Sequence, residues 1–233
     1  MKVELTRTFY FEAAHYNPFG TPGQQRLHGH SYRVDLVLTG VVTSEYGWLM
    51  DYGEIKALFE PWYALLDHQV LNEVDGLSDS RLPQLRTWIL ERIQPAFSDL
   101  ICDVHVSIVG ACEFCPIELP EDRSKRLPRR WRFTFEAAQY LPQLPETHQC
   151  RRVHGHSYRI EAGAEDMEKL REGLSAIYDQ LDHTCLNDID GLQGTTCEHM
   201  AYWMWNQLEE AGHAMTVVVV QETESARCAY YGN

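Results

Sequence analysis

The sequence lacks several features that would assign it at once to a class of protein. Its 233 residues contain no run of about 18 apolar residues, so we expect no transmembrane helix. The first residues alternate polar and apolar side chains without the apolar stretch of a secretion signal, which favours a cytoplasmic location. The seven cysteines are odd in number and irregularly spaced, so we expect free thiols in a reducing compartment.

Positive charge is also scarce. The chain has 20 Lys and Arg against 34 Asp and Glu, a net charge of −14. This balance argues against nucleic acid and against anionic membranes as partners. It leaves room for a small anionic substrate, because a local cluster such as Arg151 and Arg152 can override the mean field. Hydrophobic residues make up 44% of the chain, which excludes a disordered protein.

Three sequence blocks occur twice, in the same order. Residues 11–16 read FEAAHY and residues 135–140 read FEAAQY, while residues 28–33 and 154–159 both read HGHSYR. The third block, LDH followed by LN and then DGL, spans residues 66–77 and again 181–192. We interpret the chain as a tandem duplication of one domain.

A polar, charged segment bracketed by prolines separates the two copies, as is typical of a linker. We therefore predict a first unit over residues 1–118, a linker over residues 119–128 and a second unit over residues 129–233.

The hydrophobic pattern predicts an α+β unit in each copy. Apolar side chains of one parity predict a strand over residues 9–15. Spacings of three and four predict helices around residues 55–66 and 85–93, the second with a counterpart at 200–208. We expect an antiparallel four-stranded β-sheet with two helices on one face, whose open edges a homo-oligomer could close by forming a barrel. The β-rich runs that end the copies cover residues 104–109 and 217–220.

Three histidines in the first copy form a candidate metal site. His28 and His30 are two residues apart on a predicted strand, so both imidazoles lie on one face. His15 falls on the apolar face of the preceding strand, and three converging imidazoles with an open fourth position are typical of catalytic zinc. The alternative is a pair of core histidines with satisfied hydrogen bonds. Gly29 between them indicates a place where another backbone or a ligand comes close.

The second copy keeps His154 and His156 but has Gln139 as the third residue. Because zinc prefers nitrogen and sulfur ligands to an amide oxygen, we expect no tight site there. His148 is a possible substitute ligand.

These blocks, with the Cys-x-x-x-His-Gly-His that begins at Cys150, resemble the zinc-dependent 6-pyruvoyl-tetrahydropterin synthase / 6-carboxytetrahydropterin synthase family. The resemblance covers nearly the full chain, twice over. It implies two tandem tunnelling-fold units, oligomerisation into β-barrels with sites at subunit interfaces, and Zn²⁺ as the cofactor. It also implies a lyase that converts 7,8-dihydroneopterin triphosphate to a 6-substituted tetrahydropterin by eliminating triphosphate. Of the possible products we expect the 6-carboxy compound of queuosine biosynthesis.

The resemblance implies a role for each matching residue. His15, His28 and His30 hold zinc, Cys150 is the proton-abstracting base, and Glu222 anchors the pterin ring. The Asp–His pairs assist proton transfer; they are Asp67 with His68, and Asp182 with His183. Arg151 and Arg152 either lower the pKa of the thiol or hold the triphosphate. Each of these roles has a structural alternative. Cys150 could be an inert buried thiol, Glu222 a solvated strand end, and the Asp67–His68 pair a helix-end cap.

Each copy departs from the family pattern. Gln24 stands in the first copy where the second has Cys150. The end of its last strand, Ile108 to Ala111, aligns with Val220 to Thr223, so the anchoring glutamate is missing and Glu113 is a shifted substitute. These losses leave two other hypotheses open. One is a non-catalytic pterin- or zinc-binding protein, and the other is a zinc-activated-water hydrolase at the first site with Asp67 and His68 as the base.

Overall fold

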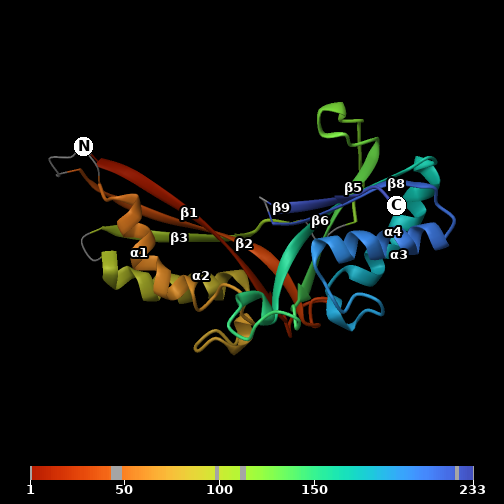
Figure 1. Ribbon diagram of the computed structural model, residues 1–233. Helices are drawn as coiled ribbons and strands as arrows, with labels where there is room; N and C mark the ends of the chain where they lie inside the picture. The colour runs from red at the N-terminus through yellow and green to blue at the C-terminus, as the bar shows by residue number, and fades with distance from the viewer. Residues whose placement is uncertain (1, 43–48, 98–99, 111–113, 224–225, 233) are drawn as a thin grey trace.

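The computed structural model describes the whole chain except residues 1, 43–48, 98–99, 111–113, 224–225 and 233. Two β-sheets lie side by side, one from each repeat, and helices pack on one side of each sheet (Figure 1). In the described part of the chain, no helix is long and apolar enough to cross a membrane.

The first half is a three-stranded antiparallel sheet with the order β1-β2-β3. Its strands are β1 (Lys2–His15), β2 (His28–Val41) and β3 (Ile101–Ile108), and its helices are α1 (Tyr52–Tyr63), α2 (Leu82–Ile93), η1 (Leu71–Glu73) and η2 (Gln94–Phe97). The inward side chains of β1 and β2 pack against one stripe of each helix, which for α2 is the predicted set Leu85, Trp88, Ile89 and Ile93. Each such side chain contributes roughly 1.5–3 kcal/mol through removal from water.

The sheet of the second half has more strands among the described residues. Its main path is β4-β5-β6-β8-β9, and β7 pairs with β5 in parallel. The strands are β4 (Ile117–Leu119), β5 (Arg130–Gln139), β6 (His154–Ala164), β7 (Thr184–Cys185), β8 (Met215–Thr223) and β9 (Ala226–Tyr230). The helices are α3 (Met167–Leu181), α4 (Cys197–Glu210), η3 (Arg123–Lys125), η4 (Gln149–Arg151) and η5 (Leu186–Asp188). Met200, Trp203, Met204 and Leu208 of α4 are buried in the core, as the helical spacing predicts.

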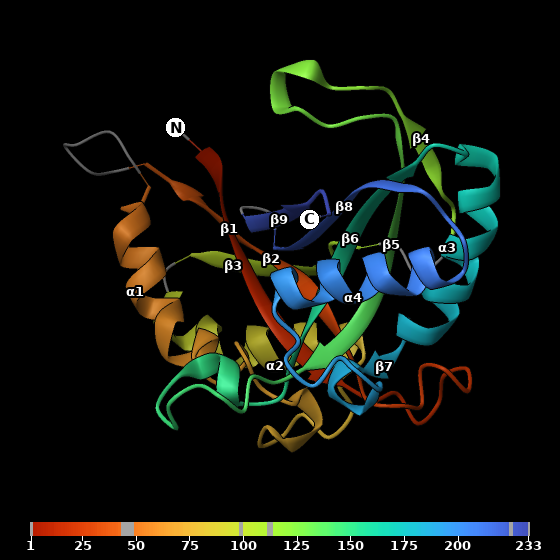
Figure 2. The same cartoon turned by 45° about the vertical axis from the view of Figure 1, so that its right-hand side comes forward.

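The expectation of four strands in each sheet is wrong. The first sheet has three strands and the second has six within the described residues. Ile117–Leu119 does not return to the first sheet; it pairs with Arg130–Arg132 of β5. Ala226–Tyr230 folds back on β8 and adds a further strand. The segment between β4 and β5, which carries η3, loops away from the body of the molecule (Figures 1 and 2).

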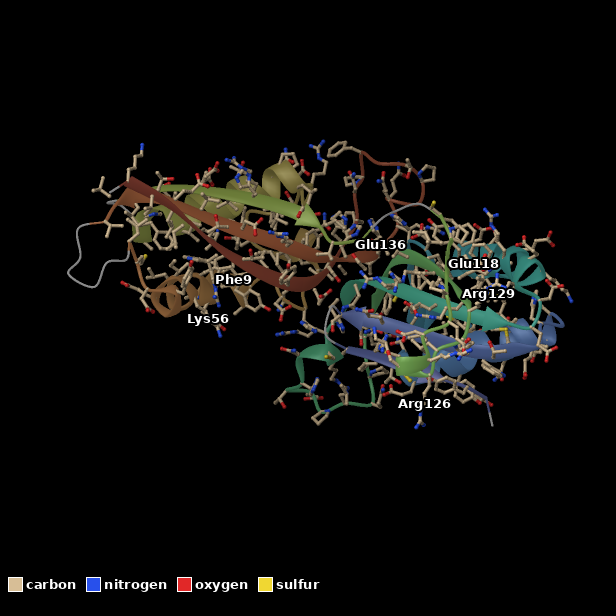
Figure 3. The ribbon with its side chains drawn as sticks, turned by 90° about the horizontal axis from the view of Figure 1, so that it is seen from above. Phe9, Lys56, Glu118, Arg126, Arg129 and Glu136 are labelled. Carbon is tan, nitrogen blue, oxygen red and sulfur yellow. The ribbon has the colours of Figure 1, made fainter. Side chains whose placement is uncertain are left out.

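The two sheets meet where the repeated HGHS motifs cross. A Cβ atom added to Gly29 would lie 2.1 Å from the Cα of Gly155, and one added to Gly155 would lie 2.1 Å from the Cα of Gly29. The backbone amide of Ser31 donates to Ser157 Oγ, and that of Ser157 donates to Ser31 Oγ, both over 3.0 Å. The close backbone approach predicted at Gly29 is therefore to the same motif of the other half. Glu136, at this junction in Figure 3, comes from β5.

Candidate metal and acid–base sites

Strand register brings the three predicted histidines together. His15 ends β1 directly opposite His28, the first residue of β2, and Ala13 lies opposite His30. The ring centroids are 4.6 to 4.9 Å apart, and one ligand nitrogen from each ring lies within 4.8 Å of the others. All three side chains are buried. We call this group, with the Asp182–His183 pair described below, site 1.

Each of these rings is held by its Nδ1 atom. His28 Nδ1 donates to the carbonyl of Arg26 over 2.8 Å, and His30 Nδ1 lies 2.7 Å from Glu136 Oε2. His15 Nδ1 lies 2.9 Å from Ser80 Oγ. A proton on Nδ1 leaves a lone pair on Nε2, and the Nε2 atoms of His15 and His30 face each other at 3.0 Å.

The electrostatics of site 1 suit a metal ion. Burial, reinforced by the neighbouring imidazoles, lowers the pKa of His15 to about 3, of His28 to about 2 and of His30 to about 3. The rings are therefore neutral at neutral pH, which is the form that binds a metal. Three neutral nitrogen donors that converge without a proton between them fit Zn²⁺.

The Asp–His pairs are exchanged between the two halves. His183, from the second half, lies over His28 of the first, with ring centroids 4.3 Å apart. His68, from the first half, lies over His154 of the second at 4.4 Å. The hydrolase hypothesis assigned Asp67 and His68 to the first zinc site, and this is wrong, because Asp182 and His183 are the pair that reaches it.

A turn with left-handed backbone positions each pair. His68 and His183 have φ values of 56° and 54°, and this lets each imidazole fold back onto the preceding aspartate. His183 Nδ1 lies 2.7 Å from Asp182 Oδ2, and His68 Nδ1 lies 2.9 Å from Asp67 Oδ2. Although burial opposes it, the hydrogen bond with His183 lowers the pKa of Asp182, so the carboxylate stays ionised.

Site 2 is the pseudosymmetric counterpart in the second half. It comprises His154, His156, Gln139, Cys150 and Glu222, with the Asp67–His68 pair. Cys150 Sγ lies 3.7 Å from His68 Nε2, so the thiol and the pair meet here and not at His15, His28 and His30. Glu222 Oε1 lies 2.9 Å from His156 Nε2 and contacts the amide nitrogen of Gln139.

The contacts of His148 and Arg151 bear on two roles predicted around site 2. His148 is exposed and accepts from the amide of Cys150 as the cap of η4, so it is not a substitute metal ligand. The Arg151 guanidinium donates to the carbonyls of Pro142 and Leu144, which ties down its own loop. Burial raises the pKa of the Cys150 thiol, and Glu222 and Asp67 raise it further, against a smaller opposite effect of Arg152. The expected activation of the thiol by arginine is therefore outweighed.

The ionic state of site 2 differs from that of site 1. Burial alone would lower the pKa of His156, but hydrogen bonds to Glu12 and Glu222 raise it to about 10. Burial would raise the pKa of Glu222, but His156 lowers it to about 2. Among the described residues, no carboxylate occupies the corresponding place in site 1, and its histidines stay neutral.

The register of β3 corrects the predicted alignment of the strand ends. Arg33 pairs with Ser107 and its repeat counterpart Arg159 pairs with Gln221, so the next residue, Ile108, corresponds to Glu222. The sequence alignment had placed Gly110 there. Ile108 and Gln24 both line a cavity of about 250 Å³ beside the site 1 histidines. Glu113, the suggested substitute, lies outside the described residues.

Sequence reasoning missed two carboxylates. Glu136 is bound to His30 across the junction, and Glu12 Oε2 lies 2.9 Å from His156 Nδ1 in the mirrored arrangement. Both occur in the repeated FEAA block, at positions whose parity is opposite to that of the apolar face. A carboxylate repeated on that face was the available signal that a second sheet lies there.

Comparisons with known proteins agree with the duplication. A sequence model of the family described as 6-pyruvoyl tetrahydropterin synthase matches residues 4–113 and 130–233. The 6-carboxy-5,6,7,8-tetrahydropterin synthase of Synechocystis sp. is 36% identical over an alignment 116 residues long, which covers 42% of this chain and 88% of that protein. The dihydroneopterin monophosphate aldolase of Pyrococcus furiosus is 28% identical over 94 residues, 40% of this chain and 77% of that protein. A solved structure of the Caenorhabditis elegans 6-pyruvoyl tetrahydropterin synthase covers 46% of this chain and 96% of its own, with 17% identity and a TM-score of 0.36.

Proposed function

Because this chain belongs to the 6-pyruvoyl tetrahydropterin synthase family, we propose that it is a zinc-dependent lyase that acts on 7,8-dihydroneopterin triphosphate. It eliminates triphosphate at site 1, and the product we expect is 6-carboxytetrahydropterin. Reaching that product also consumes one water and releases the two outer carbons of the side chain as acetaldehyde. The name of the Synechocystis relative supports this choice of product.

One observation carries the proposal. His183 brings a carboxylate-bound imidazole from the second half to the three neutral imidazoles of the first, with its ring 4.3 Å from that of His28 and 6.4 Å from that of His30. A lyase of this kind needs an electrophile and a base on the same substrate, and site 1 holds a donor set for one and a side chain for the other.

His183 is the base in this proposal. Because its Nδ1 is bound to Asp182, its Nε2 accepts the proton from the substrate side chain, and the ionised Asp182 stabilises the resulting imidazolium. The electrons of the broken C–H bond form the new double bond, and triphosphate leaves with the electrons of its C–O bond. Zinc, when bound by His15, His28 and His30, supplies a Lewis acid that lowers the pKa of the side-chain hydroxyls.

Imidazole replaces the family's thiol at this site. Gln24 occupies the thiol position, and its Oε1 accepts from the amide of Thr21, so it holds its own loop and offers no base. Cys150 remains at site 2, where Glu222 already fills the third position around the histidine pair. We therefore assign turnover to site 1, with Asp67, His68 and Cys150 outside the reacting group.

The test is product analysis after incubation with 7,8-dihydroneopterin triphosphate. The zinc-loaded chain should release triphosphate, and His28→Ala should abolish turnover. His183→Ala should lower kcat by about 100- to 10,000-fold, the usual contribution of a general base, while zinc bound at site 1 is retained.

Pseudosymmetry supplies matched controls. His68→Ala and Cys150→Ser change the equivalent pair and the thiol at site 2, and both should leave kcat within about twofold. If Cys150→Ser abolished turnover and His183→Ala did not, the reaction would belong to site 2. No triphosphate release from zinc-loaded protein would refute the lyase proposal and favour a binding protein.

A second candidate reaction is carbon–carbon cleavage of a phosphorylated dihydroneopterin. The thiol-free site 1 favours it, since a retro-aldol step needs only a base on a hydroxyl, and a relative is named dihydroneopterin monophosphate aldolase. The same assay separates the two, because cleavage yields a 6-hydroxymethyl pterin and an aldehyde. Loss of phosphate from an otherwise intact side chain would indicate hydrolysis.

A further inference from the structure

Site 2 has only two of the three histidines, but the contacts that orient those two are the same as at site 1. The His154 and His156 rings are 5.0 Å apart and inclined at 88°, against 4.9 Å and 87° for His28 and His30. His154 Nδ1 donates to the carbonyl of Arg152 over 2.7 Å, as His28 does to Arg26. Both Nε2 atoms of the pair therefore point inward, as those of a metal-binding pair do. In the metal-free protein His156 Nε2 shares a proton with Glu222, and a bound metal ion would replace that proton.

Glu222 enters the position that the third histidine occupies at site 1. Its Oε1 lies 2.9 Å from His156 Nε2, close to the 3.0 Å that separates His15 Nε2 and His30 Nε2. Ligand atoms of a tetrahedral zinc ion with bonds of about 2.05 Å lie about 3.3 Å apart, so both groups need only a slight expansion. Donor atoms of His154, His156 and Glu222 lie within 4.8 Å of one another.

Gln139 holds the glutamate in place. It pairs with His154 across the strands, as His15 does with His28, and its amide nitrogen contacts Glu222 Oε1. The other carboxylate oxygen accepts from the Cys197 thiol over 3.4 Å. Glu222 is thus aimed at the histidine pair by two neighbours, and both of its oxygens are engaged within the protein.

We propose that site 2 is a second metal site, in which His154 Nε2, His156 Nε2 and Glu222 Oε1 bind a divalent transition metal such as Zn²⁺. Two imidazoles and one carboxylate form a donor set suited to zinc and to ferrous iron. Gln139 is a positioning residue and is not a ligand. The second zinc-type centre then lies beside Cys150, on a different donor set from the three imidazoles of site 1.

A competing donor set exists at the same place. Cys150 Sγ, His68 and His154 also lie within 4.8 Å of one another. His68 is already oriented by Asp67 toward the thiol, whereas the pair of His154 and His156 reproduces the geometry of site 1. The proposal therefore commits to Glu222 and leaves Cys150 uncoordinated.

Metal content is the primary test, and it is independent of any activity at site 1. After loading with Zn²⁺ and desalting, elemental analysis should find two equivalents per chain. His28→Ala and His154→Ala should each retain one, and the double variant none. Glu222→Ala should retain one, while Ile108→Ala, the matched change in the first half, should retain two.

The absorption spectrum of the Co²⁺-loaded protein tests whether a thiolate is among the ligands. Cys150→Ser should keep two equivalents of Co²⁺, and the wild-type spectrum should lack a thiolate charge-transfer band. A wild-type content of one equivalent that survives His154→Ala would overturn the proposal. Loss of the second equivalent in Cys150→Ser would assign the metal to the thiol instead. Circular dichroism of each variant shows that it is folded.

Discussion

At the scale of single residues, the two sites differ by a few side chains set in one shared frame. His15 is matched by Gln139, Gln24 by Cys150 and Ile108 by Glu222, whereas the histidine pairs, their Nδ1 partners and the Asp–His pairs are common to both. The inward Nε2 lone pairs depend on those Nδ1 partners, so we expect the carboxylates across the junction to control metal affinity.

Burial raises the pKa of Glu136 well above its ordinary value, and a bound Zn²⁺ would favour the ionised carboxylate. Glu136→Gln should therefore weaken zinc binding at site 1 by about tenfold to a hundredfold, because the neutral amide is a poorer acceptor for His30 Nδ1 than that carboxylate. The measurement is competition with a chromogenic chelator in a His154→Ala background, where only site 1 remains. Glu12→Gln, the mirrored change, serves as the control and should leave this affinity unchanged. Equal losses in the two variants would point to a general effect on the junction.

Acid should destabilise the metal-free protein well before most carboxylates titrate. His15, His28, His30 and His154 have pKa values of about 2 to 3 when folded and an ordinary value near 6.5 when unfolded. Between these values the unfolded chain binds more protons, so the free energy of unfolding falls as pH falls from about 6.5, by up to about 1.4 kcal/mol per pH unit for each histidine.

Urea unfolding of the chelator-treated protein at a series of pH values measures this slope. His156 acts in the opposite sense, because its raised pKa of about 10 stabilises the fold below pH 6.5 and loses that contribution as pH rises toward 10. A free energy of unfolding that stayed flat between pH 6.5 and 4 would contradict buried neutral histidines.

At the scale of elements, the crossing of β2 and β6 decides the geometry of both sites. Gly29 and Gly155 allow backbone contact there, and each site draws its Asp–His pair and one carboxylate from the opposite half. The helices contribute less directly: α1 and α3 end just before the Asp–His turns and place them at the sheet edge.

Gly29→Ala should destabilise the protein by about 3 kcal/mol or more, since its Cβ would meet the backbone of Gly155 at 2.1 Å and neither strand can yield without breaking pairs. Urea denaturation of the zinc-free variant measures this loss. Gly23→Ala is the control, because its added Cβ would find its nearest neighbours at 3.8 Å. If both variants unfolded at the same urea concentration, the close approach would be refuted.

Some features of the helices and strands can be predicted from sequence patterns, and others cannot. The helical stripe of α2, its counterpart in α4 and the strands that carry the histidines follow from periodicity, because each pattern reflects one local face. The strand count does not, since Ile117–Leu119 is short and its partner strand was chosen by the tertiary fold. The alignment of the two copies also gave the wrong register, because it placed Gly110 and not Ile108 opposite Glu222.

At the scale of the whole molecule, each site takes residues from both halves, and a single chain supplies both halves. The outer edges remain: β3 ends the first sheet and β9 lies at an edge of the second, with no further strand beyond them among the described residues. Such edges are a ready surface for self-association.

The chain should therefore form a homo-oligomer in solution. Light scattering coupled to size-exclusion chromatography should give a mass that is a multiple of 27.0 kDa. A charged substitution at an exposed position of the edge strand, Ser107→Lys, should reduce that mass, while Lys56→Glu on α1 is the control. A wild-type mass of 27.0 kDa at micromolar concentration would show that the edges stay unpaired.

The sequence by itself determined the duplication, the α+β character of each half and the convergence of His15, His28 and His30, because repeats and strand parity are local properties. Only the tertiary structure decided that the Asp–His pairs are exchanged, that Glu12 and Glu136 hold the opposite histidines, and that Cys150 lies away from His15, His28 and His30. These facts depend on how two sheets cross at a pair of glycines, and contacts between residues far apart in the sequence leave no periodic trace along a chain.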